Sequence, residues 1–558
     1  MNISLYNYKR RPSSEVRIGK ISLGGDAPIR LQSMTNTATI DTDGSVAQIL
    51  RIMDEGADLV RLTAQGSKEA NNLASIKQQL QASGCDIPLV ADIHFNAALA
   101  DIAATIVDKV RINPGNYVDP GRSFKQLEYS DEEYALEIER IRSRFIPFLN
   151  ICKEHNTAVR IGVNHGSLSD RIMSRYGDTP EGMVESCMEF LRICRDEEFH
   201  NVVISIKASN TSVMVRTVRL LVRQMEKEGM SYPLHLGVTE AGDGEDGRIK
   251  SAVGIGALLA DGIGDTIRVS LSEDPEREIP VARALASYIT AREGHHHITG
   301  PSEKHNYDPI HPQRRQTVRV GQLGGGQVPL VVGNTLKGAD ISSSGMFSFS
   351  LEELQYDESV LEILRENPER PLIIRANGTN PIGIWRAFIF TLDAAGVNNP
   401  VILSREYHDE NIEDLQLKAA ADYGIMLIDG LADGILIQAP NLGSEVAVSL
   451  SFSILQAARA RFTKTEYIAC PGCGRTLFDL QQTLSRIKSA TAHLTGLKIG
   501  VMGCIVNGPG EMADADYGYV GAGPGCVSLY KGKECIMRGI PSEEAVERLL
   551  AFIEQDRK

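Results

Sequence analysis

Eight short apolar runs, rich in β-branched residues, recur along the first 290 residues and constrain the fold more than any other feature. Each run ends in polar residues and is followed by a stretch with helical periodicity. The runs are 28–35, 59–63, 88–94, 109–113, 158–165, 202–207, 234–240 and 266–270. Eight successive strand–helix units predict an α/β fold, a (β/α)8 TIM barrel, over residues 1–290. An open doubly wound sheet is the alternative, but no Gly-x-Gly-x-x-Gly follows the first run.

The polar residues at the ends of these runs form the candidate substrate site. In a (β/α)8 barrel the carboxyl ends of the strands meet at one face, where active sites lie. The residues at these ends are Arg61, Asp92, His94, Arg111, Asn113, Arg160, Asn164, Lys207, Thr239, Glu240, Arg268 and Ser270. Five are cations in a chain of net charge −14, which favours an anionic ligand, most simply a phosphate or diphosphate. The alternative for any single cation is an ion pair with an Asp or Glu of a neighbouring strand.

Glu240 is the candidate acid or base of this site. It ends a strand among cations, where a carboxyl group can give or take a proton. The alternative is that Glu240 forms an ion pair with Arg268 or Lys207. His94 alone indicates little, because a lone histidine is more often a hydrogen-bonded structural residue.

A second α/β series occupies residues 291–462, after the polar stretch 294–316 interrupts the pattern. Strands are expected at 328–332, 372–376, 401–404, 425–428 and 434–438, with helices between them. The region contains no cysteine, and its strand ends gather no comparable set of cations. We therefore predict an insert domain with a structural role, a degenerate barrel being one form that such a series can take.

The last part of the chain, residues 463–558, contains five of the nine cysteines. Cys470 and Cys473 form a Cys-x2-Cys pair, Cys504 follows, and Glu511 lies seven positions beyond it. Soft thiolates at this spacing suit an iron–sulfur cluster or zinc, and ordinary buried thiols are the third alternative. No fourth Cys or His completes the set within the local turn, so Glu511 is the nearest side chain able to act as a ligand. The expected architecture is a small α/β domain.

Composition and charge exclude several classes of protein. The net charge of −14 argues against a general nucleic-acid binder. No run of eighteen apolar residues exists, so no membrane span is expected, and the start of the chain lacks the apolar core of a signal peptide. A cytoplasmic location is the expectation. In a reducing compartment, cysteines clustered at one end indicate metal or redox work and not disulfides.

Several segments together resemble one family. They are Met34-Thr35-Asn36-Thr37, Val60-Arg61-Leu62, Ala91-Asp92-Ile93-His94-Phe95, Arg111-Ile112-Asn113-Pro114-Gly115-Asn116, Cys470-Pro471-Gly472-Cys473-Gly474-Arg475 and Cys504-Ile505-Val506-Asn507-Gly508-Pro509-Gly510-Glu511. The family is that of the 4-hydroxy-3-methylbut-2-enyl diphosphate synthases of the non-mevalonate isoprenoid pathway. The resemblance covers the barrel and the C-terminal region, while the middle region resembles the insert of the family's three-domain form.

The resemblance implies a reaction and a cofactor. The family opens the ring of 2-C-methyl-D-erythritol 2,4-cyclodiphosphate reductively and removes a hydroxyl group, which gives (E)-4-hydroxy-3-methylbut-2-enyl diphosphate. Two electrons from ferredoxin or flavodoxin pass through a [4Fe-4S] cluster. By motif, the cluster ligands are Cys470, Cys473, Cys504 and Glu511, and Glu511 moves aside to admit the substrate.

The resemblance also assigns roles in the barrel. The cations expected to hold the cyclic diphosphate are Arg61, Arg111, Arg160, Lys207 and Arg268, with Asp92, Asn113, Thr239 and Ser270 as polar neighbours. Glu240 is the candidate proton donor. We expect the insert to place the C-terminal domain over the barrel of the same chain, and a homodimer with shared sites is the alternative.

Two other functions are compatible with parts of the sequence. A pterin-binding barrel with a fused redox domain would share strand-end Asp, Asn and Lys, but the row of arginines fits a diphosphate better. A scaffold with a structural zinc knuckle would need no activity. A metal analysis distinguishes the scaffold from the synthase: the cluster gives iron and sulfide, and the zinc knuckle gives a single zinc ion.

Overall fold

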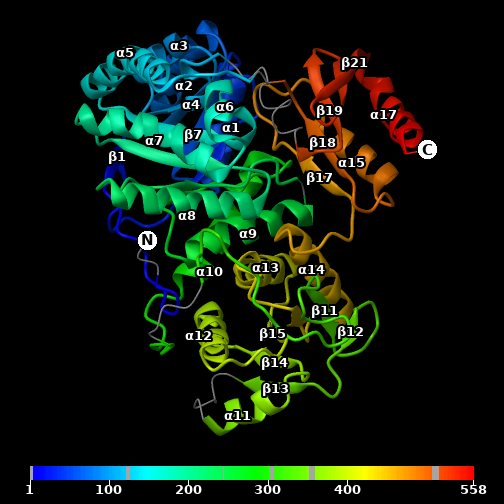
Figure 1. Cartoon of the computed structure of the whole chain (residues 1–558). Coiled ribbons are helices and arrows are strands. Elements are labelled where there is room, and N and C mark those ends of the chain that lie inside the picture. The colour runs from blue at the N-terminus through cyan, green and yellow to red at the C-terminus, as the bar shows by residue number, and fades with distance from the viewer. Residues whose placement is uncertain are drawn as a thin grey trace.

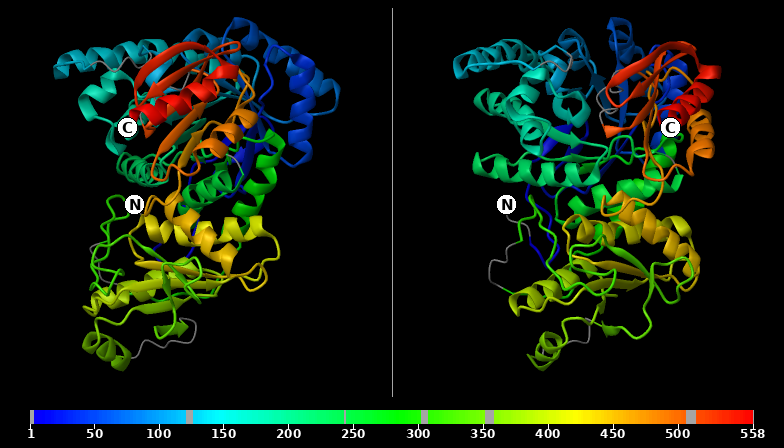
Figure 2. Two further views of the ribbon diagram at one scale, coloured as in Figure 1. Left: turned by 90° about the vertical axis from the view of Figure 1, so that its right-hand side faces the viewer. Right: turned by 45° about the vertical axis from the view of Figure 1, so that its right-hand side comes forward.

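The computed structural model describes residues 4–120, 126–242, 244–301, 307–350, 358–505 and 514–557. These residues form three large sheets and one two-stranded hairpin. Figures 1 and 2 show the C-terminal sheet, orange to red, beside the barrel, with the sheet of the insert beneath the barrel. The two halves of the predicted site are therefore neighbours within one chain.

The first sheet is a barrel of eight parallel strands in the order β8-β7-β6-β5-β4-β3-β10-β9. Its strands are β3 (Arg30–Met34), β4 (Leu59–Ala64), β5 (Leu89–Ile93), β6 (Lys109–Ile112), β7 (Ala158–Asn164), β8 (Val202–Lys207), β9 (His235–Leu236) and β10 (Thr266–Ile267). A parallel bridge between Ile204 and Leu234 joins the two edges of the sheet. All eight predicted runs are confirmed as strands, and the barrel excludes the open doubly wound sheet.

The helices that alternate with these strands lie on the outside of the barrel (Figure 1). The longer ones are α1 (Thr42–Asp54), α2 (Ser67–Ala82), α3 (Ala97–Ala104), α5 (Asp131–His155), α7 (Pro180–Asp196), α8 (Thr211–Lys227), α9 (Gly244–Ala260) and α10 (Glu278–Thr290). Several of these helices have side-chain caps: Asp41, Asn96 and Asn210 each accept a hydrogen bond from an N–H of the first turn. Ser130 and Glu133 form a capping box at the start of α5.

A hairpin of β1 (Val16–Ile18) and β2 (Ile21–Leu23) lies at the N-terminal end of the barrel. It joins side chains from the first residues of the barrel strands in one apolar cluster, whose buried members are Val16, Ile18, Leu23, Leu59, Val90, Ala158 and Val203. The cluster fills this end of the barrel, so a ligand must approach from the carboxyl ends of the strands.

The insert is built on a second parallel sheet, in the order β12-β11-β16-β15-β14-β13. Its strands are β11 (Leu330–Gly333), β12 (Ile341–Ser342), β13 (Phe347–Ser350), β14 (Leu372–Arg375), β15 (Val401–Glu406) and β16 (Gly434–Gln438). Its helices are α11 (Glu358–Glu366), α12 (Pro381–Ala394), α13 (Ile412–Ile428) and α14 (Ser444–Ala457). The strand expected at 425–428 is wrong, because these residues end α13. A short buried apolar run cannot be assigned to strand or helix by its pattern alone.

The insert repeats a feature of the barrel. Val318-Arg319-Val320-Gly321 precedes β11 much as Val16-Arg17-Ile18-Gly19 precedes β3. In both segments the arginine donates from Nε to the carbonyl oxygen of the glycine, at 3.3 Å for the first and 3.1 Å for the second. This likeness, together with the all-parallel sheet, fits the degenerate barrel.

The barrel and the insert pack closely through α9 and α13. A Cβ at Gly256 would lie 2.9 Å from the Cβ of Ala421, and one at Gly424 would lie 3.0 Å from Val253, so glycine lets the two helix backbones approach. Beside them lies a fully buried ionic quartet. The quartet consists of Arg219 and Asp261 of the barrel with Arg386 and Asp429 of the insert, and all four Arg–Asp pairs lie at 2.7–3.3 Å.

The C-terminal sheet has the order β17-β18-β19-β20-β21, and its first three strands are parallel. The strands are β17 (Glu466–Ala469), β18 (Lys498–Met502), β19 (Tyr517–Gly523), β20 (Cys526–Lys531) and β21 (Glu534–Pro541), with helices α15 (Leu480–Thr491) and α17 (Ser542–Asp556). It has its own hydrophobic core, whereas one continuous core runs through barrel and insert. A parallel bridge between Ala241 and Ala469 aligns the end of β17 with the barrel mouth.

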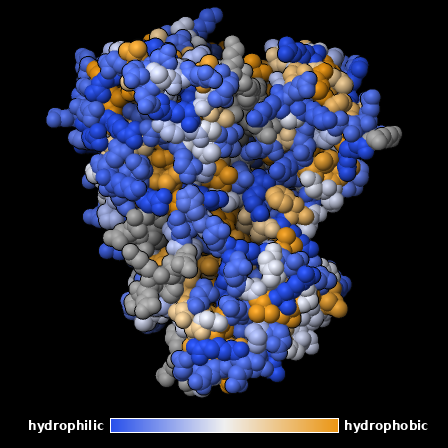
Figure 3. All heavy atoms as spheres, viewed as in Figure 1, coloured by the Kyte–Doolittle hydropathy of each residue, from blue (hydrophilic) through white to orange (hydrophobic). Residues whose placement is uncertain are grey.

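The face of the molecule drawn in Figure 3 gives little indication of function. On the face drawn in Figure 3, hydrophobic residues are scattered among hydrophilic ones and do not gather in one large patch. Among the described helices, none combines the length and the apolar composition that crossing a bilayer requires.

Candidate active site

One pocket unites the strand ends of the barrel with the cysteine loops of the C-terminal sheet. The expected residues that line it are Arg61, Asp92, His94, Arg111, Arg160, Asn164, Lys207, Thr239, Glu240, Arg268, Ser270, Cys470, Cys473 and Cys504. Asn113 does not line it, and instead donates to the Ser167 hydroxyl at 2.8 Å. Glu511 lies outside the described residues. The pocket therefore contains both the cations and the thiols that the sequence singled out.

The strand pattern explains why the cations point inward. Alternate residues of a strand face opposite sides of the sheet, so Leu59, Arg61 and Thr63 share one face of β4. Two glycines make room for the long side chains. A Cβ at Gly162 would lie 2.5 Å from the Nε of Arg111, and one at Gly237 would lie 2.6 Å from the Nζ of Lys207.

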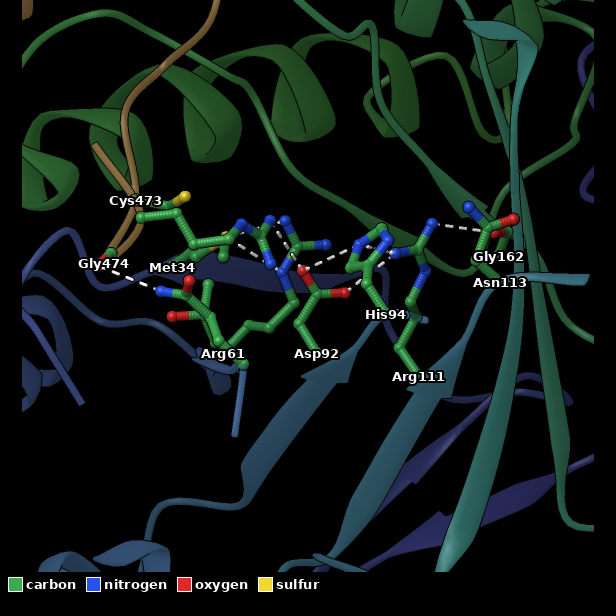
Figure 4. A network of polar contacts seen from close by, with 12 residues as sticks. Met34, Arg61, Asp92, His94, Arg111, Asn113, Gly162, Cys473 and Gly474 are labelled. Atoms are coloured by element: carbon green, nitrogen blue, oxygen red, sulfur yellow. Dashed lines mark hydrogen bonds and ion pairs between the residues drawn. The ribbon is translucent and has the colours of Figure 1, made fainter. Parts of the chain in front are cut away.

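Asp92 is the centre of the polar network in Figure 4. Its carboxylate lies 3.0 Å from Arg111 Nη1, 3.5 Å from His94 Nε2 and 3.4 Å from Arg475 Nη2. Burial alone would raise the pKa of Asp92, but Arg61, Arg111 and His94 hold it well below its usual range. Asp92 therefore stays ionised and fixes the cations around it.

Arg268 has a carboxylate partner of its own. Glu278, at the start of α10, receives hydrogen bonds from Arg268 at 2.7 and 2.9 Å and from the Ser33 hydroxyl at 2.7 Å. The expected alternative, an ion pair with a carboxylate of a neighbouring strand, therefore holds for Arg111, which pairs with Asp92 of β5. The partner of Arg268 comes from a helix instead. Glu240 is not the partner of Arg268.

The other three barrel cations have no carboxylate at ion-pair distance among the described residues, although Arg61 lies near enough to Asp92 to lower the pKa of that carboxyl. Within the described part of the chain, Arg61 donates to the sulfur of Met34, at 2.7 and 3.0 Å, and burial lowers its pKa to about 10. Arg160 is 1% exposed, and no described residue accepts a hydrogen bond from its Nε and Nη1 atoms. Burial and the surrounding arginines hold the pKa of Lys207 well below its usual range. A buried excess of positive charge of this kind fits an anionic ligand.

Glu240 is buried at the edge of the pocket with a left-handed backbone, φ 49°. Non-glycine residues adopt this conformation at a cost, and such residues cluster at functional sites. Burial raises the pKa of Glu240 to about 7, against the opposing effects of Thr239 and Lys207. Its Oε2 atom has no hydrogen-bond partner among the described residues. Glu240 can therefore hold a transferable proton near neutral pH.

The three thiols enter the pocket from the ends of two neighbouring strands. Cys470 follows β17 and accepts a hydrogen bond at Sγ from the Gly503 N–H, 3.2 Å away, while Cys504 follows β18. The Ser272 hydroxyl donates to the Cys470 carbonyl oxygen at 2.8 Å and ties this loop to the barrel. Gly474 lies so close to the barrel that a Cβ would meet the Thr37 carbonyl oxygen at 2.6 Å.

The cysteine side of the pocket offers three thiols, a donor set that suits an iron–sulfur cluster or zinc. Within the described residues, no group of three His, Cys, Asp or Glu side chains is placed to hold a metal ion. The other two cysteines of this part of the chain, Cys526 and Cys535, are partly exposed in β20 and β21.

Comparison with known proteins decides the family. The GcpE TIM-barrel domain matches residues 13–283, and the GcpE protein C-terminal domain matches residues 466–555. A protein from Bacteroides fragilis named 4-hydroxy-3-methylbut-2-en-1-yl diphosphate synthase (flavodoxin) is 56% identical over 99% of this chain and 96% of its own. The chain belongs to this synthase family. Synthases of the same name from Porphyromonas gingivalis and Protochlamydia amoebophila are 51% and 43% identical, over 99% of this chain and 99% and 97% of theirs.

These synthases also share the insert. The two family domains leave residues 284–465 unmatched, whereas the full-length synthases align with 99% of this chain. The resemblance to the three-domain form is thereby confirmed. A dihydropteroate synthase structure from Xanthomonas albilineans covers 50% of this chain and 99% of its own, at 14% identity and a TM-score of 0.33. So low a score supports no inference.

The pocket also contains Arg475 and Met34, which the sequence did not single out as site residues. Arg475 reaches from the cysteine loop to Asp92 and is buried, and Glu278, which does not line the pocket, holds Arg268 from the start of α10. Met34 supplies the sulfur that Arg61 contacts. Arg475 lies two residues after Cys473, so the cysteine motif could have indicated it. Nothing in the sequence indicated Glu278, because a glutamate at a helix start is ordinarily explained by its favourable interaction with the helix dipole.

Proposed function

We propose that this chain converts 2-C-methyl-D-erythritol 2,4-cyclodiphosphate to (E)-4-hydroxy-3-methylbut-2-enyl diphosphate. The substrate takes up two electrons and two protons, one ring C–O bond to the diphosphate breaks, one hydroxyl leaves as water, and a C=C bond forms. The observation that carries this proposal is the single pocket in which barrel cations face Cys470, Cys473 and Cys504. It combines an anion site with ligands for a redox cofactor.

The barrel cations bind the diphosphate in this proposal. Arg61, Arg160 and Lys207 have no carboxylate at ion-pair distance among the described residues, so their donor groups are available to the ligand. Arg111 and Arg268 are held in place by carboxylates and offer fixed donors. Fixed cations in a buried pocket stabilise the negative charge that develops as the ring oxygen leaves carbon. Asp92, Thr239 and Ser270 are the polar neighbours, and Asn113 braces the Ser167 loop.

Glu240 is the proposed proton donor to the departing hydroxyl. The protonated carboxyl is available near neutral pH because burial raises its pKa to about 7. Glu240 precedes Ala241, which is bridged to Ala469 at the end of β17, and Cys470 follows directly. The proposed proton donor and the cysteine loop are therefore held by the same contact.

The proposed cofactor is a [4Fe-4S] cluster held by Cys470, Cys473, Cys504 and Glu511, of which Glu511 is the exchangeable ligand. When bound, the cluster supplies electrons to the substrate one at a time. Arg475 lies beside the thiols and balances their negative charge. Flavodoxin is the proposed electron donor, because the curated relatives carry it in their names, and ferredoxin is the alternative.

The proposed domains are a substrate-binding barrel at 1–290, a structural insert at 291–462 and a cluster domain at 463–558. The described contacts close the pocket within one chain, so a second subunit is not needed. Mixing a Glu240→Ala chain with a Cys504→Ala chain tests this proposal. We expect no restored activity, and restored activity would mean that the site is shared across a homodimer.

Anaerobic purification followed by an assay with the cyclic diphosphate tests the function itself. The parent should contain about four irons with sulfide and turn over with reduced flavodoxin. Cys504→Ala should lose iron and activity. Cys535→Ala, which removes a thiol of β21 outside the pocket, is the matched control and should keep both. Bound zinc in place of iron, or equal activity in the two variants, contradicts the proposal.

A further inference from the structure

A fully buried lysine lies one layer below the substrate pocket. On β6, Lys109 and Arg111 share the inward face, and Lys109 is nearer the plugged end of the barrel. Its side chain is 0% exposed and does not line the pocket. Its Nζ donates to Oε1 of Gln32 at 3.3 Å. The Nε2 atom of Gln32 has no hydrogen-bond partner among the described residues.

The charged groups that face Lys109 are cations. They are Arg61 of β4 and Arg160 of β7, and together with burial they hold the pKa of Lys109 well below its usual range. His235 of β9 also faces this layer, and burial with the neighbouring cations keeps its pKa low. Within the described residues no carboxylate lies at ion-pair distance from Lys109. The adjacent Asp108 is engaged elsewhere, by Lys77 at 3.3 Å and the Leu89 N–H at 2.9 Å.

Lysine differs from arginine in one respect that matters here. An arginine keeps its charge in any protein, whereas a buried lysine can release its proton. In a pocket with an excess of cations, Lys109 is therefore an adjustable charge, as is Lys207 in the pocket itself, and the arginines are permanent ones. An anion that enters the pocket adds attraction for a positive charge on Lys109, across a medium of low polarity where such interactions reach further than in water.

We infer that Lys109 takes up a proton when the anionic substrate enters the pocket above it, so that substrate binding is coupled to protonation of this residue. This inference rests on the proposed function, which supplies the anion. Lys109 is a positioning residue, because it acts through the arginine layer and does not touch the substrate. Because of this coupling, Lys109 is neutral in the empty barrel, where its charge would be buried without a partner. It becomes charged when the diphosphate is bound above it.

Titration calorimetry of the oxidised holoenzyme measures this coupling directly. Without reductant the cyclic diphosphate binds but is not turned over. The binding heat, measured near neutral pH in buffers of different ionisation enthalpy, gives the number of protons taken up. Every protein in this experiment, the parent included, carries Glu240→Gln, so that titration of Glu240 does not contribute to the measured proton uptake. Inorganic diphosphate serves as a second probe.

Two substitutions at Lys109 separate its charge from its bulk. Lys109→Met keeps the apolar stem but can never be charged, and should lower the uptake by up to about one proton and weaken binding about tenfold. Lys109→Arg is always charged and should lower the uptake equally while keeping the affinity. Thermal unfolding shows whether each variant is folded, and the Met variant suffices if the Arg variant is not.

The outcomes distinguish the inference from the proposed function. If the parent binds neither the cyclic diphosphate nor inorganic diphosphate, the proposed function fails. If the parent binds and Lys109→Met shows the same proton uptake and affinity, Lys109 is a structural filler and the inference is overturned. Reduced uptake in Lys109→Met supports it, because a filler would leave the proton count unchanged.

Discussion

Replacing Glu240 by Gln should stabilise the folded chain at alkaline pH while impairing its activity. Glu240 is 3% exposed, and burial raises its pKa to about 7. The folded chain therefore binds this proton more tightly than the unfolded chain, where the glutamate has its ordinary value of 4.5. The stability that this proton contributes is fully present below pH 4.5 and is lost as the pH rises through 7.

The magnitude follows from the two pKa values. A rise from 4.5 to about 7 corresponds to about 3 kcal/mol in the free energy of unfolding. Glutamine has nearly the shape of the protonated acid and stays neutral at every pH. We therefore expect Glu240→Gln and the parent to be about equally stable at low pH. At high pH the variant should be more stable by about 3 kcal/mol.

Urea unfolding at a pH below 5 and again above 8 measures this difference. Glu278→Gln is the control, because Glu278 is equally buried but paired with Arg268. Breaking that pair should destabilise the fold by about 3–5 kcal/mol at both pH values. If Glu240→Gln is no more stable than the parent at high pH, the carboxyl group is not held protonated by burial. The proton-donor role would then lose its physical basis.

Three further predictions follow from the same structure. First, kcat/KM should fall about tenfold per pH unit above pH 7 as Glu240 ionises, and Glu240→Gln should lower kcat about 10²–10⁴-fold and abolish this dependence, as measured by initial rates. Second, Gly474→Ala should lower kcat about a hundredfold at nearly unchanged thermal stability, because a Cβ 2.6 Å from the Thr37 carbonyl oxygen must move the cysteine loop; an unchanged kcat would show that the loop adapts. Third, Asp429→Asn should lower the free energy of unfolding by about 3–5 kcal/mol in urea, because it leaves two buried arginines with one carboxylate, and a loss below 1 kcal/mol would contradict this account.

The barrel could be predicted from the sequence because its strands are read as apolar runs. Inward and outward residues of each strand are both buried, so the runs are nearly continuous, and the polar residues that interrupt them face the pocket. The same reasoning failed at 425–428. There, α13 is buried on most sides against α9, so its last turn is as uniformly apolar as a strand.

The composition of the pocket was predictable, but its pairings were not. Charge at strand ends indicated Arg61, Arg160 and Lys207. Which cation pairs with which carboxylate depends on contacts across the barrel, such as Arg268 with Glu278 and Arg475 with Asp92, 383 residues apart. Such contacts leave no local pattern. The plug at the N-terminal end was also missed, because β1 and β2 are only three residues long each.

The buried quartet between barrel and insert has a consequence for how the chain unfolds. Each part supplies one arginine and one aspartate, and a single hydrophobic core continues across the boundary. Separating the two parts would leave buried charges without their partners and would expose apolar surface. The free energy of unfolding either part alone is therefore high. The C-terminal sheet has a core of its own. We expect two cooperative transitions on heating, one for barrel plus insert and one for the cysteine-bearing sheet, so that the thiol side of the pocket can be lost and regained while the arginine side stays folded.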